Sequence, residues 1–152
     1  DRNTCKIFTG NSRLDTLQAI VAKHLIKKID HITEKRIANA DFFDDNLSSM
    51  SSIFIPPRSH NAKQVFHIYV IRSKKRDELK KYLIDNGVDA KIHYPIPMHL
   101  QPAAKEFGYK EGDFPNAELI CKSVLSLPVH EFITKEQREY VVQKINFFFT
   151  NN

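Results

Sequence analysis

Apolar residues in the first third of the chain recur at steps of three and four. They are Leu14, Leu17, Val21, Leu25, Ile29 and Ile32, continued by Ile37, Ala40, Phe43 and Leu47. This spacing predicts one amphipathic α-helix. Ser12 and Asp15 have the spacing of a capping box, with Ser12 as the N-cap residue. An unbroken helix of ~35 residues would be about 50 Å long. That is wider than a domain of this size, so we expect the helix either to break or to extend over a partner.

The remaining pattern alternates short strands with single helices. Runs rich in β-branched and aromatic residues predict strands at 53–55, 65–72, 88–94 and 124–127. Helices are expected at 76–86, at 115–123 and from 135 onward. The strand at 65–72 is apolar on both faces and is expected to be central. This order indicates an α+β fold, a small mainly antiparallel sheet with flanking helices and one long N-terminal helix.

Three local signals mark where these helices begin and end. Gly87 has the position of a left-handed C-terminal cap. Asp113 is expected to cap a helix whose first residue is Pro115. Thr134 and Gln137 form a second capping box, which opens the last helix. We expect two parts in the chain: residues 1–50, a long helix at an interface, and residues 51–152, a small C-terminal domain.

Composition excludes several classes of protein. The chain has 152 residues, of which 41% are hydrophobic and 27% charged, as in ordinary globular domains. No apolar run approaches the length of a membrane span, and the start lacks a signal-peptide pattern. Cys5 and Cys121 are too few for a disulfide scaffold and too isolated for a zinc site. We therefore expect a cytoplasmic protein without membrane contact. The missing initiator methionine suggests that the chain starts inside a longer protein.

The net charge of +5 raises the question of a nucleic-acid partner. The basic residues are interleaved with acidic ones, however, as at Lys74-Lys75-Arg76-Asp77-Glu78. Interleaving favours a solvated surface over a nucleic-acid patch, so we expect no nucleic acid. A modest positive field equally suits a small phosphorylated ligand.

The segment HYPIPMHLQP, residues 93–102, concentrates polar rings among prolines. Proline fixes its own φ and keeps the preceding residue out of the helical region. We therefore expect a stiff extended ribbon that carries His93, Tyr94 and His99. These side chains either bind a polar ligand or cap the core, and the residues alone leave both open. The histidines fit no standard metal-ligand spacing, so no metal is expected.

The start of the first helix is a second candidate. Asn11, Ser12 and Arg13 lie where free backbone N–H groups and the helix dipole favour an anion. A plain helix cap is the alternative. The chain has no Gly-x-Ser-x-Gly motif, its cysteines have no evident histidine partner, and its carboxylates are scattered. We therefore expect no catalytic residue within this span.

Four motifs then indicate a family. They are NSRLDTLQA, FHIYVIRSKKRDELKKYL, DAKIHYPIPMHLQPA and GDFPNAELICKSVLSLPVH, in this order. Together they resemble the C-terminal part of the DegT/DnrJ/StrS family of nucleotide-sugar aminotransferases. The resemblance implies a fold type I enzyme that uses pyridoxal 5′-phosphate (PLP) and works as a homodimer. Such enzymes move an amino group from glutamate to a keto group of a nucleotide-linked sugar, in amino-sugar and polysaccharide biosynthesis. The ribbon most resembles the subgroup that acts at carbon 3 of dTDP-linked deoxy sugars.

The resemblance also assigns roles. It implies that Asn11, with Arg13, binds the cofactor phosphate of the neighbouring subunit, and that His93, Tyr94 and His99 contact the substrate. The family's Gly-Tyr before the asparagine is Thr9-Gly10 here. The Schiff-base lysine and most PLP contacts belong ahead of residue 1, so this span alone is expected to be inactive. Two alternatives stay open: a non-catalytic dimerisation and substrate-contact module, and a PLP-dependent sugar dehydratase of the same family.

Overall fold

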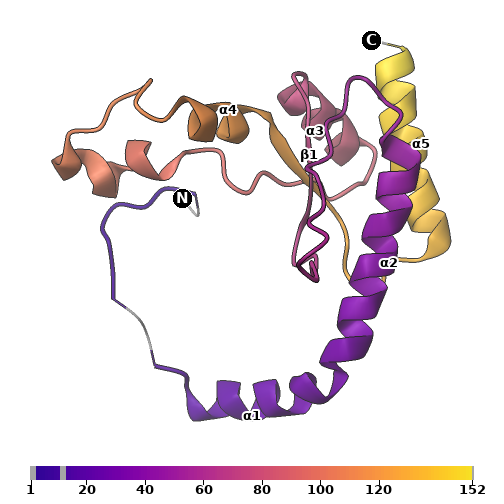
Figure 1. Cartoon of the computed structure of the whole chain (residues 1–152), viewed down its shortest axis with the longest axis horizontal. Coiled ribbons are helices and arrows are strands. Elements are labelled where there is room, and N and C mark those ends of the chain that lie inside the picture. Colours follow the sequence, from indigo (N-terminus) through magenta and orange to yellow (C-terminus); the bar gives the residue numbers. More distant parts are fainter. Residues whose placement is uncertain (1–2, 11–12, 152) are drawn as a thin grey trace.

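The computed structural model describes residues 3–10 and 13–151 (Figure 1). Its helices and strands, in chain order, are α1 (Thr16–Leu25), the 3₁₀ turn η1 (Ile26–Lys28), α2 (Ile29–Leu47), β1 (Tyr69–Arg72), α3 (Arg76–Asp85), the 3₁₀ turns η2 (Met98–Leu100) and η3 (Pro102–Phe107), α4 (Pro115–Ser123), β2 (Val124–Leu127) and α5 (Lys135–Thr150). This is the expected α+β fold, with a small antiparallel sheet and a long helical N-terminal region.

The long N-terminal helix breaks, which was one of the two outcomes expected. The 3₁₀ turn η1 separates α1 from α2, and Figure 1 shows the change of direction there. The predicted cap was wrong in position. Asp15 caps α1, because its carboxylate accepts a 2.8 Å hydrogen bond from the Leu17 amide, and Gln18 completes the capping box. Ser12 lies outside the described residues. No described residue of α1 is buried.

The sheet is smaller than the sequence predicts. β1 and β2 pair antiparallel, with Tyr69 opposite Leu127. Single bridges add Phe54 beside Arg72 and Lys91 beside Ser126. The strands predicted at 53–55 and 88–94 are therefore reduced to one bridging residue each. The strand predicted at 65–72 starts only at Tyr69, because Phe66 adopts a left-handed backbone with φ of 48°. β1 still lies between Phe54 and β2, so its central position is confirmed.

The core lies between this sheet and α2, α3 and α5. Its fully buried side chains are Phe43, Leu47, Tyr69, Ile71, Leu79, Leu83, Leu125 and Ile145. At ~25 cal/mol per Å² of apolar surface, such side chains dominate folding. On α5 the apolar residues Val141, Ile145 and Phe148 are also buried.

Among the predicted ends of the later helices, those at Gly87 and Thr134 agree with the structure and that at Asp113 does not. Gly87 has a φ of 76°, as its cap role requires, and Thr134 forms the expected capping box with Gln137. Pro115 opens α4, but Phe114 rather than Asp113 is its N-cap residue. The Asp113 carboxylate instead accepts a hydrogen bond from the Lys110 amide. Its side chain is thus taken up by the loop before the helix.

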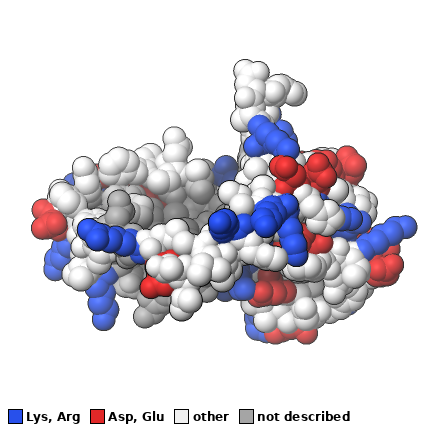
Figure 2. Space-filling view, turned by 90° about the horizontal axis from the view of Figure 1, so that it is seen from below, with Lys and Arg blue, Asp and Glu red and all other residues white. Residues whose placement is uncertain are grey.

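The surface has mixed charge. On the face shown in Figure 2, Lys and Arg side chains are dispersed and alternate with Asp and Glu. In the described part of the chain no helix is both long and apolar enough to cross a membrane. Residues 3–10 and 13–151 also contain no cluster of metal-binding side chains.

Candidate functional site

The ribbon begins where the chain leaves the edge of the sheet. Lys91 exchanges two backbone hydrogen bonds with Ser126, and the chain then passes through a cis peptide bond between His93 and Tyr94. Pro97 is extended, with φ of −67° and ψ of 151°. The 3₁₀ turns η2 and η3 follow directly. The prediction of one extended ribbon as far as Pro102 is therefore wrong beyond Pro97, because the backbone coils once the two closely spaced prolines are passed.

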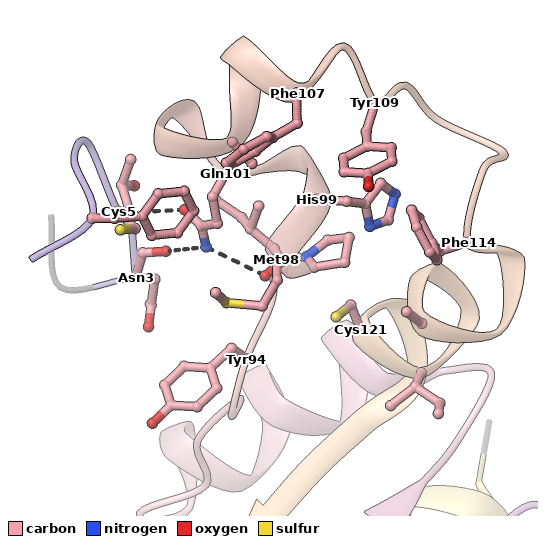
Figure 3. Close-up of a pocket in the computed structure, with 17 residues that line it drawn as sticks. Asn3, Cys5, Tyr94, Met98, His99, Gln101, Phe107, Tyr109, Phe114 and Cys121 are labelled. Carbon is pink, nitrogen blue, oxygen red and sulfur yellow. Dashed lines mark hydrogen bonds between the residues drawn. The ribbon is translucent and has the colours of Figure 1, made fainter.

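The ribbon forms one wall of a pocket of about 760 Å³ (Figure 3). The other walls come from the N-terminal segment, η3 and α4. We call this cavity the ribbon pocket. Most of the lining is apolar or aromatic, and the rings come from Phe8, Tyr94, Phe107, Tyr109 and Phe114. A pocket of this size, mainly apolar with a few polar groups, is typical of a small-molecule site.

Gln101 holds the N-terminal segment against this pocket. It is 6% exposed, and its Oε1 accepts a 2.8 Å hydrogen bond from the Cys5 amide. Its Nε2 donates to the carbonyl oxygens of Asn3, at 3.1 Å, and Ile96, at 3.3 Å. The Ala103 amide donates to the Cys5 carbonyl. Sequence reasoning missed Gln101. A lone amide between prolines in an otherwise apolar stretch was the available signal.

His99 lies in the pocket wall and is paired. Its Nε2 is 3.0 Å from Oε1 of Glu118, and the two side chains are only 7% and 8% exposed. The same oxygen accepts a hydrogen bond from the Gly112 amide at 2.9 Å. That amide bond and the bond to His99 lower the pKa of Glu118. Sequence reasoning missed Glu118, although an acid in the first turn of a helix is a recognisable signal. The pair fixes the His99 ring, which packs 4.7 Å from the Phe114 ring.

The other two ribbon residues differ from each other. Tyr94 is 62% exposed, lines the pocket and points away from the core (Figure 3). The Nδ1 atom of His93 lies 3.0 Å from the Ser126 hydroxyl, and the His93 ring stands edge-on to Tyr94 at 5.5 Å. His93 does not line the pocket. The fold therefore brings Tyr94 and His99 to one pocket and leaves His93 behind Tyr94.

Of the two predicted phosphate contacts at the first helix, only Arg13 belongs to the described residues. Asn11 lies outside the described residues. Arg13 is exposed and is absent from the pocket lining. The cap of α1 is the carboxylate of Asp15, which places negative charge at that helix end.

The pocket can bind a ligand, but it offers little reactive chemistry. Among the described residues, none that lines the pocket is a lysine or an arginine. Cys121 lines the pocket and is half-buried, and desolvation raises the pKa of its thiol. A raised pKa leaves little thiolate near neutral pH.

Residues 1–146 match the model of the DegT/DnrJ/EryC1/StrS aminotransferase family, and the chain belongs to this family. It is 39% identical over 91% of its length to a pleiotropic regulatory protein from Geobacillus stearothermophilus. It is 33% identical over 89% of its length to a dTDP-3-amino-3,4,6-trideoxy-alpha-D-glucose transaminase from Streptomyces venezuelae.

The solved structures agree. The crystal structure of S. venezuelae DesV in complex with a ketimine intermediate matches 91% of this chain with a TM-score of 0.86 and 33% identity. The chain spans 38% and 36% of the length of the two relatives, and 37% of the DesV chain.

The family implies PLP. The described residues that line the ribbon pocket do not fit this cofactor by themselves, because they supply neither an amine for a Schiff base nor a cation for its phosphate. We therefore derive no step through PLP from this pocket.

Proposed function

We propose that this chain is the substrate-contact domain of a PLP-dependent aminotransferase. In this proposal the whole protein moves an amino group from glutamate to a keto group, at carbon 3, of a dTDP-linked deoxy sugar. The observation that carries the proposal is the ribbon pocket in a chain of this family. The name of the S. venezuelae relative places its amino group on carbon 3 of a dTDP-linked sugar, which supports the finer assignment.

The lining of the pocket suits such a ligand. A deoxy sugar and a pyrimidine base both present apolar faces, which aromatic side chains such as Tyr94 and Phe107 can cover. A few polar groups are enough to orient a ligand in an apolar pocket. His99 and Tyr94 are the polar rings at this place, and we propose both as substrate contacts. We propose that His93 contributes to substrate binding indirectly, by packing edge-on against Tyr94.

Cofactor binding is proposed to involve other parts of the protein. Asn11 and Arg13 are proposed to contact the PLP phosphate of a neighbouring subunit. Residues 1–50 are proposed to form an interface, as the apolar surface of α1 suggests. Leu17, Ile20 and Ile26 are 74%, 61% and 67% exposed, which is unusual for large aliphatic side chains on a helix. A homodimer in the cytoplasm is the proposed assembly.

The test is an assay of the whole protein with PLP, glutamate and dTDP-linked keto sugars. We expect a dTDP-linked amino sugar, identified by mass spectrometry, together with 2-oxoglutarate. A deoxygenated sugar without nitrogen would instead support the dehydratase alternative. Absence of turnover in protein that has bound PLP would contradict the proposal and favour a non-catalytic module. A UDP-linked sugar offered beside the dTDP-linked one tests the nucleotide assignment.

A further inference from the structure

A second pocket lies on the opposite side of α4 from the ribbon pocket. Ala117, Ile120 and Cys121 of α4 line the ribbon pocket, whereas Leu119 and Ser123 line the second one. The 100° turn per residue of an α-helix puts these two sets on opposite faces. The second pocket also has a volume of about 760 Å³ and is bounded by the end of β1 and the start of α3. We call it the basic pocket.

Three cationic residues, Arg72, Lys74 and Lys75, line the basic pocket, and no acidic residue does. Asp77 and Glu78 follow in the first turn of α3, but both are exposed and neither belongs to the lining. The pocket is therefore electropositive, although the charge of the wider surface is mixed.

Arg72 is held in place without a counter-charge. Its Nε donates a 3.1 Å hydrogen bond to the Ser123 hydroxyl, and its guanidinium carbon lies 5.2 Å from the centroid of the Phe54 ring. Within residues 3–10 and 13–151, neither Arg72 nor Lys74 takes part in an ion pair. A half-buried guanidinium whose contacts are a hydroxyl and a ring loses hydration without gaining a charged partner. A bound anion would supply that partner.

The other lining groups narrow the class of ligand. Ser51 and Ser52 are exposed and bring hydroxyl donors to the pocket, and guanidinium, ammonium and hydroxyl groups together are the usual donors to phosphate oxygens. Phe54, which is 51% exposed, and Phe149 add aromatic wall for a planar ring. The three cations line one pocket of this size, which fits a small molecule better than a polymer.

We propose that the basic pocket binds a small phosphorylated molecule with a planar ring, of the nucleoside monophosphate class. The phosphate contacts Arg72, Lys74 and the serine hydroxyls, and the ring lies against the phenylalanine wall. This site is independent of the proposed aminotransferase activity, since it shares no lining residue with the ribbon pocket.

The test is a titration of the ¹⁵N-labelled full chain with AMP at low ionic strength, followed by amide shifts. AMP carries one phosphate and one aromatic ring and is neither substrate nor product of the proposed reaction. We expect saturable shifts at residues 51–54 and 72–75. Adenosine, which lacks the phosphate, is expected to leave these amides unmoved.

Two double variants that lose the same charge distinguish binding at the basic pocket from a general electrostatic attraction to the surface. Lys74→Gln with Lys75→Gln removes two exposed lysines of the pocket and is expected to weaken AMP binding by about tenfold or more. Lys80→Gln with Lys105→Gln removes two lysines outside it and is expected to leave binding unchanged. Arg72→Gln should abolish saturation, and its far-UV circular dichroism checks the fold. Equal losses in both double variants, non-saturating shifts or shifts only around the ribbon would overturn the proposal.

Discussion

The Tyr69 hydroxyl donates a 2.7 Å hydrogen bond to Oδ1 of Asp44, and this bond joins β1 to α2 inside the core. Arg58 completes the arrangement with two bonds to the same carboxylate, at 2.8 and 2.6 Å. Its guanidinium also lies 4.8 Å from the Phe66 ring centroid. The long connection between residues 55 and 68 is thus fastened to the sheet and to α2 by one carboxylate.

Tyr69→Phe removes one bond of this arrangement and leaves the ring. We expect the free energy of unfolding to fall by about 1.5–3 kcal/mol, the usual worth of a hydrogen bond to a charged group. Urea denaturation followed by circular dichroism measures it. Tyr140→Phe is the matched control, because its hydroxyl bonds only to the Asn86 carbonyl at an exposed position. A loss no greater than that of the control would contradict a special role of Asp44.

The same bond predicts a dependence on alkaline pH. Desolvation, followed by the bond to Asp44, raises the pKa of Tyr69 in the folded state. An unfolded tyrosine ionises near pH ~10. The stabilisation from neutral Tyr69 is therefore complete below that pH and is lost progressively as pH rises above it. Denaturation midpoints measured from pH 8 to 11 should fall more steeply in the wild-type chain than in Tyr69→Phe.

Gln101→Ala should release the N-terminal segment from the pocket. The substitution leaves the Cys5 amide and the Asn3 carbonyl without their partner, so local opening becomes easier by about 1–3 kcal/mol. Amide hydrogen exchange of Cys5 and Ala103 should accelerate, while core amides such as that of Leu125 keep their protection. Gln143→Ala, at an exposed position on α5, serves as the control. Unchanged exchange at Cys5 would show that the segment is held by something else.

Glu118→Gln should change how stability responds to acid. The Gly112 amide and then His99 lower the pKa of Glu118 below its ordinary value. A lowered folded-state pKa gives stability that is present above the unfolded value, near pH ~4.3, and is lost as pH falls through the folded one. The wild-type chain should lose stability below that pH more strongly than Glu118→Gln. Glu106→Gln, an exposed substitution in η3, should keep the wild-type profile.

Substitution of Tyr94 should weaken ligand binding more than substitution of its neighbour His93. Tyr94→Ala removes an exposed ring from the pocket and should weaken binding of dTDP by about tenfold, as measured by calorimetry. His93→Ala should have a smaller effect, because His93 reaches the pocket only through Tyr94. A larger loss for His93→Ala would mean that the ligand lies on the sheet side of the ribbon. Tyr140→Ala, outside the pocket, should bind normally.

Features set by neighbours in sequence were predictable. The capping box at Thr134, the left-handed Gly87, the strand at 124–127 and the apolar face of α5 each depend on side chains within one or two turns. The break in the long helix was one of two predicted outcomes, because a helix of that length must either break or extend over a partner. The order of four motifs was sufficient to indicate the family.

Other features depend on residues far apart in the chain. The sequence predicted longer strands at 65–72 and 88–94, but backbone turns at Phe66 and in the proline ribbon leave only a short stretch of β1 and a single bridge in register. Gln101 meets Cys5 across 96 positions, and His99 meets Glu118 across 19. Local propensity carries no information about such pairs, because the path of the backbone between the partners decides whether they meet. The sequence by itself therefore determined the helices, the caps at Gly87 and Thr134 and the start of the polar ribbon. Only the tertiary structure decided that Tyr94 and His99 line one pocket while His93 does not.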